Sequence, residues 1–171
     1  MIVEVDEPAA ARVAESDGAE AVVIRSLVAG LREATELPIL WHGGGTPADA
    51  ELAGADAVLV VAEDYDDGEG IGEVVAGAAR LGLDLVVSVS SEEVLERVLE
   101  LHDPETFHLA TADLEQALEL LSDVPVGKLA IAESDDVTRA QVVELERRGV
   151  DAVIVPSRNV AELVGGAPPA V

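Results

Sequence analysis

Cysteine is absent from this chain of 171 residues, and lysine occurs only once, as Lys128. Without cysteine the chain can form no disulfide, no thiolate metal site and no cysteine nucleophile. Aromatic residues are scarce too, with one tryptophan, one tyrosine and one phenylalanine. The shortage of positive charge disfavours nucleic acid and anionic membranes as partners, because neutralising phosphate groups requires clustered lysine and arginine.

The sequence also has no long apolar run. A membrane-spanning helix would need about 18 or more apolar residues in succession, and a secretory signal would begin with a basic segment before an apolar one. Neither pattern occurs. We therefore expect a cytoplasmic protein. With an apolar content of 49%, we expect one domain over residues 1–171, ending in a flexible tail at 166–171.

Acidic residues dominate the charge, with 35 Asp and Glu against 10 Lys and Arg and a formal net charge of -25. Self-repulsion on this scale weakens a compact state in dilute buffer, whereas at about 1 M salt the screening length falls to about 3 Å. We therefore hypothesise that the protein is halophilic and works in concentrated salt. An ordinary acidic protein is the alternative.

A short phrase recurs four times, at residues 18–24, 54–60, 82–87 and 149–155. Each copy has a glycine, an acidic residue two places later and a run of aliphatic residues. Glycine ends a helix by adopting a left-handed conformation, and an unbroken aliphatic run is typical of a parallel strand covered on both faces. The phrase predicts the point where a helix ends and a buried strand begins.

The whole chain reads as eight strand–helix units, which favours a compact (βα)8 TIM barrel. The alternative, an open doubly wound sheet, would carry a glycine fingerprint in its first turn, and residues 6–9 have none. Each unit averages only about 21 residues, so this is a barrel of minimal length. The predicted strands are residues 2–5, 21–24, 37–41, 57–62, 85–89, 106–110, 128–132 and 149–155. The predicted helices are 9–18, 27–34, a short one after Thr46, 71–80, 91–101, one from Asp113, 137–148 and a rudimentary eighth at 160–163.

Chemistry in such barrels takes place at the carboxyl ends of the strands. His42 and Glu133 are the best acid and base candidates there, because imidazole titrates near neutrality and burial raises the pKa of a carboxylate. A rim of solvated polar groups is the alternative. His102 and His108 are predicted to be structural, at a loop and at a strand start.

Further residues are predicted to line the same mouth. Trp41 is expected either to stack on a planar ligand or to pack at the barrel lip. A phosphate site is disfavoured because the loop after the seventh strand carries Asp135 and Asp136. The predicted ligand-contacting residues are Arg25, Trp41, Ser88, Thr111 and Arg158.

Five acidic residues at strand ends could converge as oxygen ligands for a divalent cation. Solvated acids are expected everywhere in so acidic a chain, however, and we expect no metal site and no cofactor. The five are Glu4, Asp6, Glu63, Asp64 and Glu133.

The chain resembles the indole-3-glycerol-phosphate synthase family, ribulose-phosphate-binding barrels of tryptophan biosynthesis. The likeness is clearest at residues 37–40, 53–59, 91–95, 133–134 and 148–155. The family closes a ring and expels carbon dioxide, so the resemblance implies a carboxy-lyase. It also implies that Glu4 matches a strand-one glutamate and that Glu133 and Ser134 match the strand-seven pair.

The remaining family positions do not match. The strand-one lysine corresponds to Asp6, and the strand-three Arg-Lys pair to Trp41 and His42, of which His42 could replace the lysine acid. The strand-five glutamate corresponds to Ser88, the asparagine region to Ala110 and Thr111, and the phosphate-binding glycines to Asp135 and Pro156. We therefore expect a divergent and truncated family member whose ancestral activity is lost or altered. The alternative is a non-catalytic barrel that binds a small molecule at its mouth or pairs with another subunit, including a second copy of itself.

Overall fold

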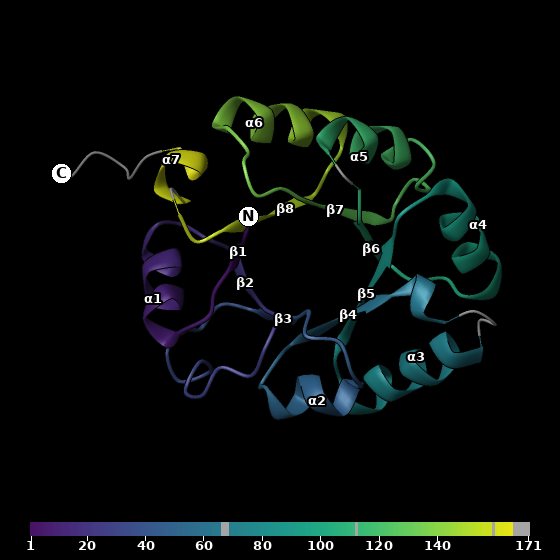
Figure 1. Cartoon of the computed structure of the whole chain (residues 1–171), viewed down its shortest axis with the longest axis horizontal. Helices are drawn as coiled ribbons and strands as arrows, with labels where there is room; N and C mark the ends of the chain where they lie inside the picture. Colours follow the sequence, from purple (N-terminus) through teal and green to yellow (C-terminus); the bar gives the residue numbers. More distant parts are fainter. Residues whose placement is uncertain (66–68, 112, 159, 166–171) are drawn as a thin grey trace.

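The protein forms a closed barrel of eight parallel strands in sequence order, so the predicted (βα)8 TIM barrel is confirmed (Figure 1). The computed structural model describes residues 1–65, 69–111, 113–158 and 160–165. The predicted tail at 166–171 lies outside these residues. The strands are β1 (Ile2–Glu4), β2 (Ala21–Ile24), β3 (Ile39–Trp41), β4 (Ala57–Val61), β5 (Asp84–Val89), β6 (Thr106–Leu109), β7 (Leu129–Glu133) and β8 (Ala152–Pro156).

Helices surround the barrel as the outer layer (Figure 1). The eighth helix is rudimentary, as predicted, with five residues. Within the described residues, no helix is long and apolar enough to cross a bilayer. The helices are α1 (Pro8–Ser16), α2 (Pro47–Leu52), the 3-10 turn η1 (Ala62–Asp64), α3 (Glu69–Leu81), α4 (Glu92–Leu101), α5 (Leu114–Leu121), α6 (Arg139–Arg148) and α7 (Val160–Val164).

The predicted helix at 27–34 is wrong, because β2 and β3 are joined by an irregular loop of turns. Gly30 has a φ of 77°, a left-handed conformation that interrupts a right-handed helix. Side-chain bonds hold the loop instead: Arg32 donates to the backbone oxygens of Thr35 and Leu37 at 2.5 and 2.8 Å. Leu31 is 1% exposed, so the loop covers the barrel wall without forming a helix.

The repeated phrase works as predicted, and its acidic residue has a further structural role. Gly54 and Gly149 have φ angles of 71° and 103°, which only glycine adopts readily. Asp56 Oδ2 accepts a hydrogen bond from the backbone N–H of Ile39 at 2.8 Å, and Asp151 Oδ2 does the same for Ala130 at 2.8 Å. Each carboxylate thus fixes the start of the preceding strand beside its own.

Alternation along the strands separates two apolar cores. One lies between the barrel and its helices, and the other fills the barrel interior. Because side chains alternate in direction along a strand, the residue two places after an interior residue also faces inward. This parity sends polar side chains from the strand ends into the mouth. The interior aliphatic residues are Ile2, Val23, Leu40, Leu59, Val86, Ile131 and Ile154.

Candidate functional site

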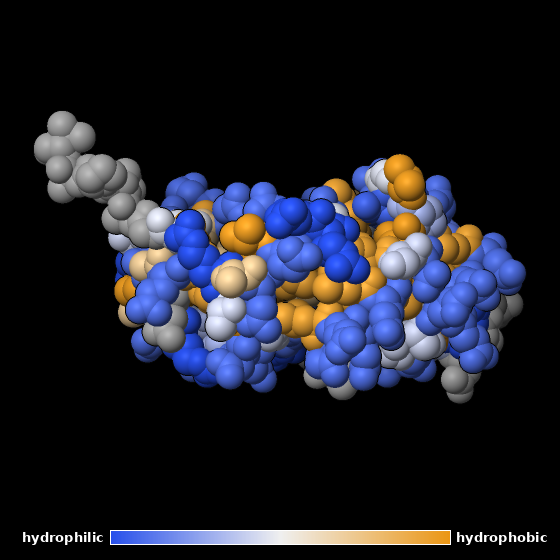
Figure 2. Space-filling model, turned by 90° about the horizontal axis from the view of Figure 1, so that it is seen from above, coloured by the Kyte–Doolittle hydropathy of each residue, from blue (hydrophilic) through white to orange (hydrophobic). Residues whose placement is uncertain are grey.

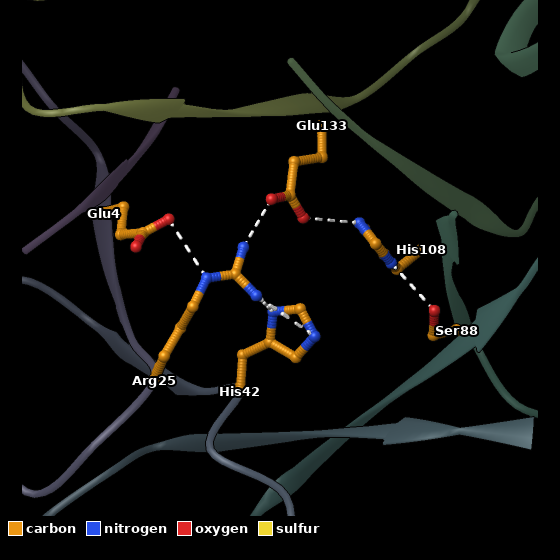
Figure 3. Close-up of polar contacts among 6 residues, drawn as sticks. All are labelled: Glu4, Arg25, His42, Ser88, His108 and Glu133. Carbon is orange, nitrogen blue, oxygen red and sulfur yellow. Dashed lines mark hydrogen bonds and ion pairs between the residues drawn. The ribbon is translucent and has the colours of Figure 1, made fainter. Parts of the chain in front are cut away.

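Arg25, which follows β2, spans the mouth of the barrel and contacts residues at the ends of β1 and β7 and just after β3 (Figure 3). Its Nε donates to Glu4 Oε2 at 3.1 Å, and its Nη2 pairs with Glu133 Oε1. Its Nη1 contacts His42 Nδ1. The Arg25 side chain is 37% exposed, so this network lies at the boundary between the barrel interior and solvent.

The contact with Arg25 fixes the protonation state of His42. A guanidinium can only donate, so His42 Nδ1 must accept and the imidazole is neutral. Burial, followed by the charges of Arg25 and His108, lowers the pKa of His42 to about 4, although Glu133 acts in the opposite direction. The expectation that His42 titrates near neutrality is therefore wrong, because its neighbours are cationic and its surroundings are poorly hydrated.

Glu133 also departs from the expectation. Contact with His108 is the largest cause that lowers the pKa of Glu133, and the charge of Arg25 acts in the same direction. Burial raises the pKa of Glu133, but its effect is smaller than the combined lowering by the other groups. A carboxyl with a lowered pKa is a weaker base, so the predicted upward shift is wrong because the side chain lies among cationic and hydrogen-bonding groups.

His108 is one of the residues that the sequence analysis placed incorrectly. It is the third of four residues in β6, is 3% exposed and faces the barrel interior. Its Nδ1 lies 2.9 Å from Ser88 Oγ on β5, and its Nε2 lies 3.1 Å from Glu133 Oε2 on β7 (Figure 3). The alternation of polar and apolar residues over 106–109 is the signal that could have identified it, because it places His108 on the inner face.

A cavity of about 910 Å³ opens beside this network, over the carboxyl ends of β4 to β7. It is lined by His42, Ser88, His108 and Glu133, and also by Thr111 and Ser134, as the sequence predicted. No three histidine or acidic side chains among the described residues are arranged to hold a metal ion. The remaining ionisable side chains of the lining are all acidic: Glu63, Asp113, Glu115, Asp135 and Asp136.

Two predicted ligand contacts lie elsewhere. Trp41 belongs to the core between the barrel and the helices, is 7% exposed, and donates its indole N–H to the Gly44 oxygen at 2.8 Å. Strand parity explains this position, because His42 faces inward and its neighbour must face outward. Arg158 donates to the backbone oxygen of Asp135 and lines a separate small cleft rather than the cavity.

The comparisons with known proteins agree with this architecture. Residues 48–161 match the family model described as indole-3-glycerol phosphate synthase. A relative named indole-3-glycerol phosphate synthase, from Salinibacter ruber (strain DSM 13855 / M31), is 32% identical over 114 residues. That match covers 63% of this chain but only 42% of the relative, so the chain spans less than half of the relative's length.

Two solved structures show the same fold at low sequence identity. The N-acetylmannosamine-6-phosphate 2-epimerase of Clostridium perfringens superposes with a TM-score of 0.72 at 15% identity, covering 94% of this chain and 86% of the epimerase chain. A chain of the tryptophan synthase α2β2 complex of Pyrococcus furiosus gives 0.69 at 15% identity, covering 96% and 97%. The family match extends over most of the barrel, and the chain belongs to the indole-3-glycerol phosphate synthase family.

Proposed function

We propose that this barrel has lost or altered the ring-closing, decarboxylating reaction of its family. The observation that carries the proposal is the network around Arg25, in which Glu4, Glu133 and His42 are all engaged with one guanidinium. From the sequence, His42 and Glu133 are the acid and base candidates, and Glu4 is the match of a family glutamate. In this arrangement they neutralise or bind each other instead of facing a substrate.

The protonation states support the same conclusion. With a pKa of about 4, His42 is a neutral imidazole at neutral pH and lacks the imidazolium proton that a general acid donates. Glu133, with its lowered pKa, is a poor proton acceptor. A single well-placed acid or base contributes about 10² to 10⁴ in rate. Without a matched acid and base, we expect each missing group to cost a factor of this size.

The negative charge of the cavity also supports the loss or change of the family's reaction. Asp135 and Asp136 occupy the loop after β7, Glu63 lies after β4, and Asp113 and Glu115 lie at the start of α5; all five line the cavity. Like charges repel, and the repulsion strengthens where water is partly excluded. A phosphate ester, which carries up to two negative charges, is therefore a poor ligand for this cavity.

The test is turnover of the synthase substrate, followed by the fluorescence of the indole product in dilute buffer and in concentrated KCl. We expect no product above the uncatalysed rate, with an active family enzyme in the same buffers as the positive control. Turnover that His42→Ala or Glu133→Gln abolishes would overturn the proposal. Circular dichroism of each variant separates loss of activity from loss of fold.

A second candidate is a binding module for a small cationic or neutral molecule. The observation that favours it is the cavity itself, because about 910 Å³ lies within the usual range for small-molecule sites. Its acidic lining would attract an amine. Amines at millimolar concentration should then raise the melting temperature, and Asp136→Asn and Glu115→Gln should reduce the effect. Equal effects of matched carboxylic acids would exclude this candidate.

Self-association is the other form of the binding-module hypothesis. Figure 2 shows apolar side chains gathered between hydrophilic ones on one face of the molecule. Val143 on α6 and Val164 on α7 are 44% and 42% exposed, beside a second cavity of about 460 Å³. Sedimentation equilibrium decides the point: a dimer that Val143→Lys dissociates supports it, and a monomer at all concentrations contradicts it.

A further inference from the structure

Ser88, His108 and Glu133 form a continuous chain of polar contacts across three neighbouring strands (Figure 3). Ser88 and His108 lie directly opposite each other in the register of β5 and β6. Ser88 Oγ is 2.9 Å from His108 Nδ1, and His108 Nε2 is 3.1 Å from Glu133 Oε2. This is the connectivity of a nucleophile, a general base and a carboxylate that orients the base.

The hydrogen-bonding pattern selects one arrangement of protons for this chain when His108 is neutral. The Ser88 hydroxyl donates to Nδ1, and the ring proton is on Nε2, facing the Glu133 carboxylate. Among the described residues, Nε2 has no well-aligned hydrogen bond, although Glu133 is within reach. Such contacts in unliganded sites are often loose and tighten when a substrate binds.

The surroundings separate these residues from the general polar surface. Ser88 and His108 are 2% and 3% exposed and, with Thr35, are the buried polar side chains of the described chain. Both nevertheless line the 910 Å³ cavity, so its floor presents a hydroxyl that is hydrogen-bonded to an imidazole. Buried polar groups are costly unless they are paired, and here the pair faces a space that can hold a ligand.

We propose that Ser88 is the nucleophile of a serine acyl-transfer site, with His108 as its general base and Glu133 as a positioning residue, and that it hydrolyses esters of neutral or cationic acids. The selectivity follows from the acidic lining of the cavity, which repels anionic acyl groups. The proposal goes beyond the loss of the synthase reaction and uses different chemistry. The result of the synthase assay therefore neither supports nor contradicts this proposal.

The chemical steps need only the ester and water. Ser88 Oγ bonds to the carbonyl carbon while its proton moves to His108 Nδ1. The bond from that carbon to the alcohol oxygen then breaks, and the alcohol takes the proton from His108. Water attacks the acyl-serine, His108 accepts its proton and returns it to Ser88 Oγ, and the carboxylic acid leaves. Glu133 stabilises the imidazolium, and the neutral His42 ring, 5.8 Å away between centroids, adds no opposing charge.

The experiment is labelling of the full chain with an alkyl fluorophosphonate, with the modified residue identified by mass spectrometry. We expect one label per chain, on Ser88, and none in Ser88→Ala. Ser122→Ala is the matched control, because Ser122 is an exposed serine just after α5 whose hydroxyl donates to the Leu118 oxygen. No labelling of the folded protein, or labelling at a different serine, would overturn the proposal.

Two further measurements test the roles of the other two residues. His108→Ala should slow labelling by at least about 100-fold, the lower range for loss of a general base, and added imidazole should restore part of the rate. Glu133→Gln should slow it while Glu133→Asp retains more, since Asp keeps a carboxylate. Labelling of Ser88 at an unchanged rate in His108→Ala would refute the role of His108 as the general base.

Substrate selectivity provides a test on the unmodified protein, which does not depend on variants folding. p-Nitrophenyl acetate should give a burst of one p-nitrophenolate per chain. The p-nitrophenyl monoester of glutaric acid, which has an additional negative charge, should react at least about tenfold more slowly, corresponding to about 1.4 kcal/mol. A faster reaction of the anionic ester would contradict the assigned substrate class, and absence of a burst would contradict the site.

Discussion

The lowered pKa of His42, which follows first from burial and then from the charge of Arg25, can be measured by NMR. The Arg25 guanidinium donates to His42 Nδ1, and the pKa of His42 falls to about 4. Its imidazole signals should therefore stay constant between pH 8 and about 5.5, where a histidine of ordinary pKa, about 6.5, would already be mostly protonated. The part of the titration between pH 8 and about 5.5 is enough to distinguish the two pKa values. Lower pH is not needed, where the protein is least soluble because its pI is about 4.1.

The same shift sets a stability change of known sign. The unfolded chain binds a proton at His42 near pH 6.5, and the folded chain does so only near pH 4. Stability is therefore fully present above pH 6.5 and is lost as pH falls between these values. A full shift corresponds to roughly 3 kcal/mol, which partial exposure reduces to about 1–2 kcal/mol.

Two variants test this explanation. His42→Gln keeps a hydrogen-bond acceptor but cannot titrate, so urea unfolding at pH 7 and pH 5 should show a smaller loss of stability than in the parent chain. Arg25→Gln should raise the pKa of His42 only partly towards its usual value, because burial is the larger cause. A measured pKa of 6 or above for His42 in the parent chain would refute the reasoning.

Three further predictions concern stability. The melting temperature should rise markedly between dilute buffer and multimolar KCl, because salt screens the net charge of -25; an unchanged value contradicts the halophile hypothesis. Asp151→Ala should cost about 1–3 kcal/mol in urea unfolding, because it leaves the Ala130 N–H unpaired; a cost near zero would mean that water replaces the carboxylate. Phe107→Ala, at a side chain with 0% exposure, should cost about 3–5 kcal/mol, whereas Val13→Ala, at a 56% exposed position, should stay within about 0.5 kcal/mol.

The sequence was sufficient to predict the barrel because its signals are local. The glycine of each repeated phrase ends a helix, and the aliphatic run after it forms a strand buried on both faces. Helix starts were equally readable: Asp113 accepts from the Glu115 and Gln116 N–H groups as its position suggested. The loop at 27–34 was missed because Gly30 adopts a left-handed conformation there and Arg32 donates to the backbone oxygen of Thr35, which the local pattern does not reveal.

The site was predictable only in part, since strand parity and side-chain pairing depend on three-dimensional neighbours. Ser88, Glu133 and His42 were placed at the mouth because they lie at or just after the carboxyl ends of predicted strands. For Trp41, the structure shows the packing alternative rather than ligand stacking. His108 was misassigned to a strand start, although it is the third residue of β6 and faces inward. The pKa directions of His42 and Glu133 could not be predicted either. They depend first on burial for His42 and on His108 for Glu133, and then on Arg25, which lies 17 and 108 residues away in sequence.

The central claim is that this barrel does not bind the phosphate-bearing substrates of its family, because its mouth is acidic and Arg25 is paired with Glu4 and Glu133. Titration of ribulose 5-phosphate, followed by ³¹P NMR in concentrated KCl, tests this most directly. We predict no saturable change in the phosphorus signal up to millimolar protein. Saturable binding that Arg25→Gln removes would contradict the claim, because it would show that Arg25 exchanges Glu4 and Glu133 for a phosphate.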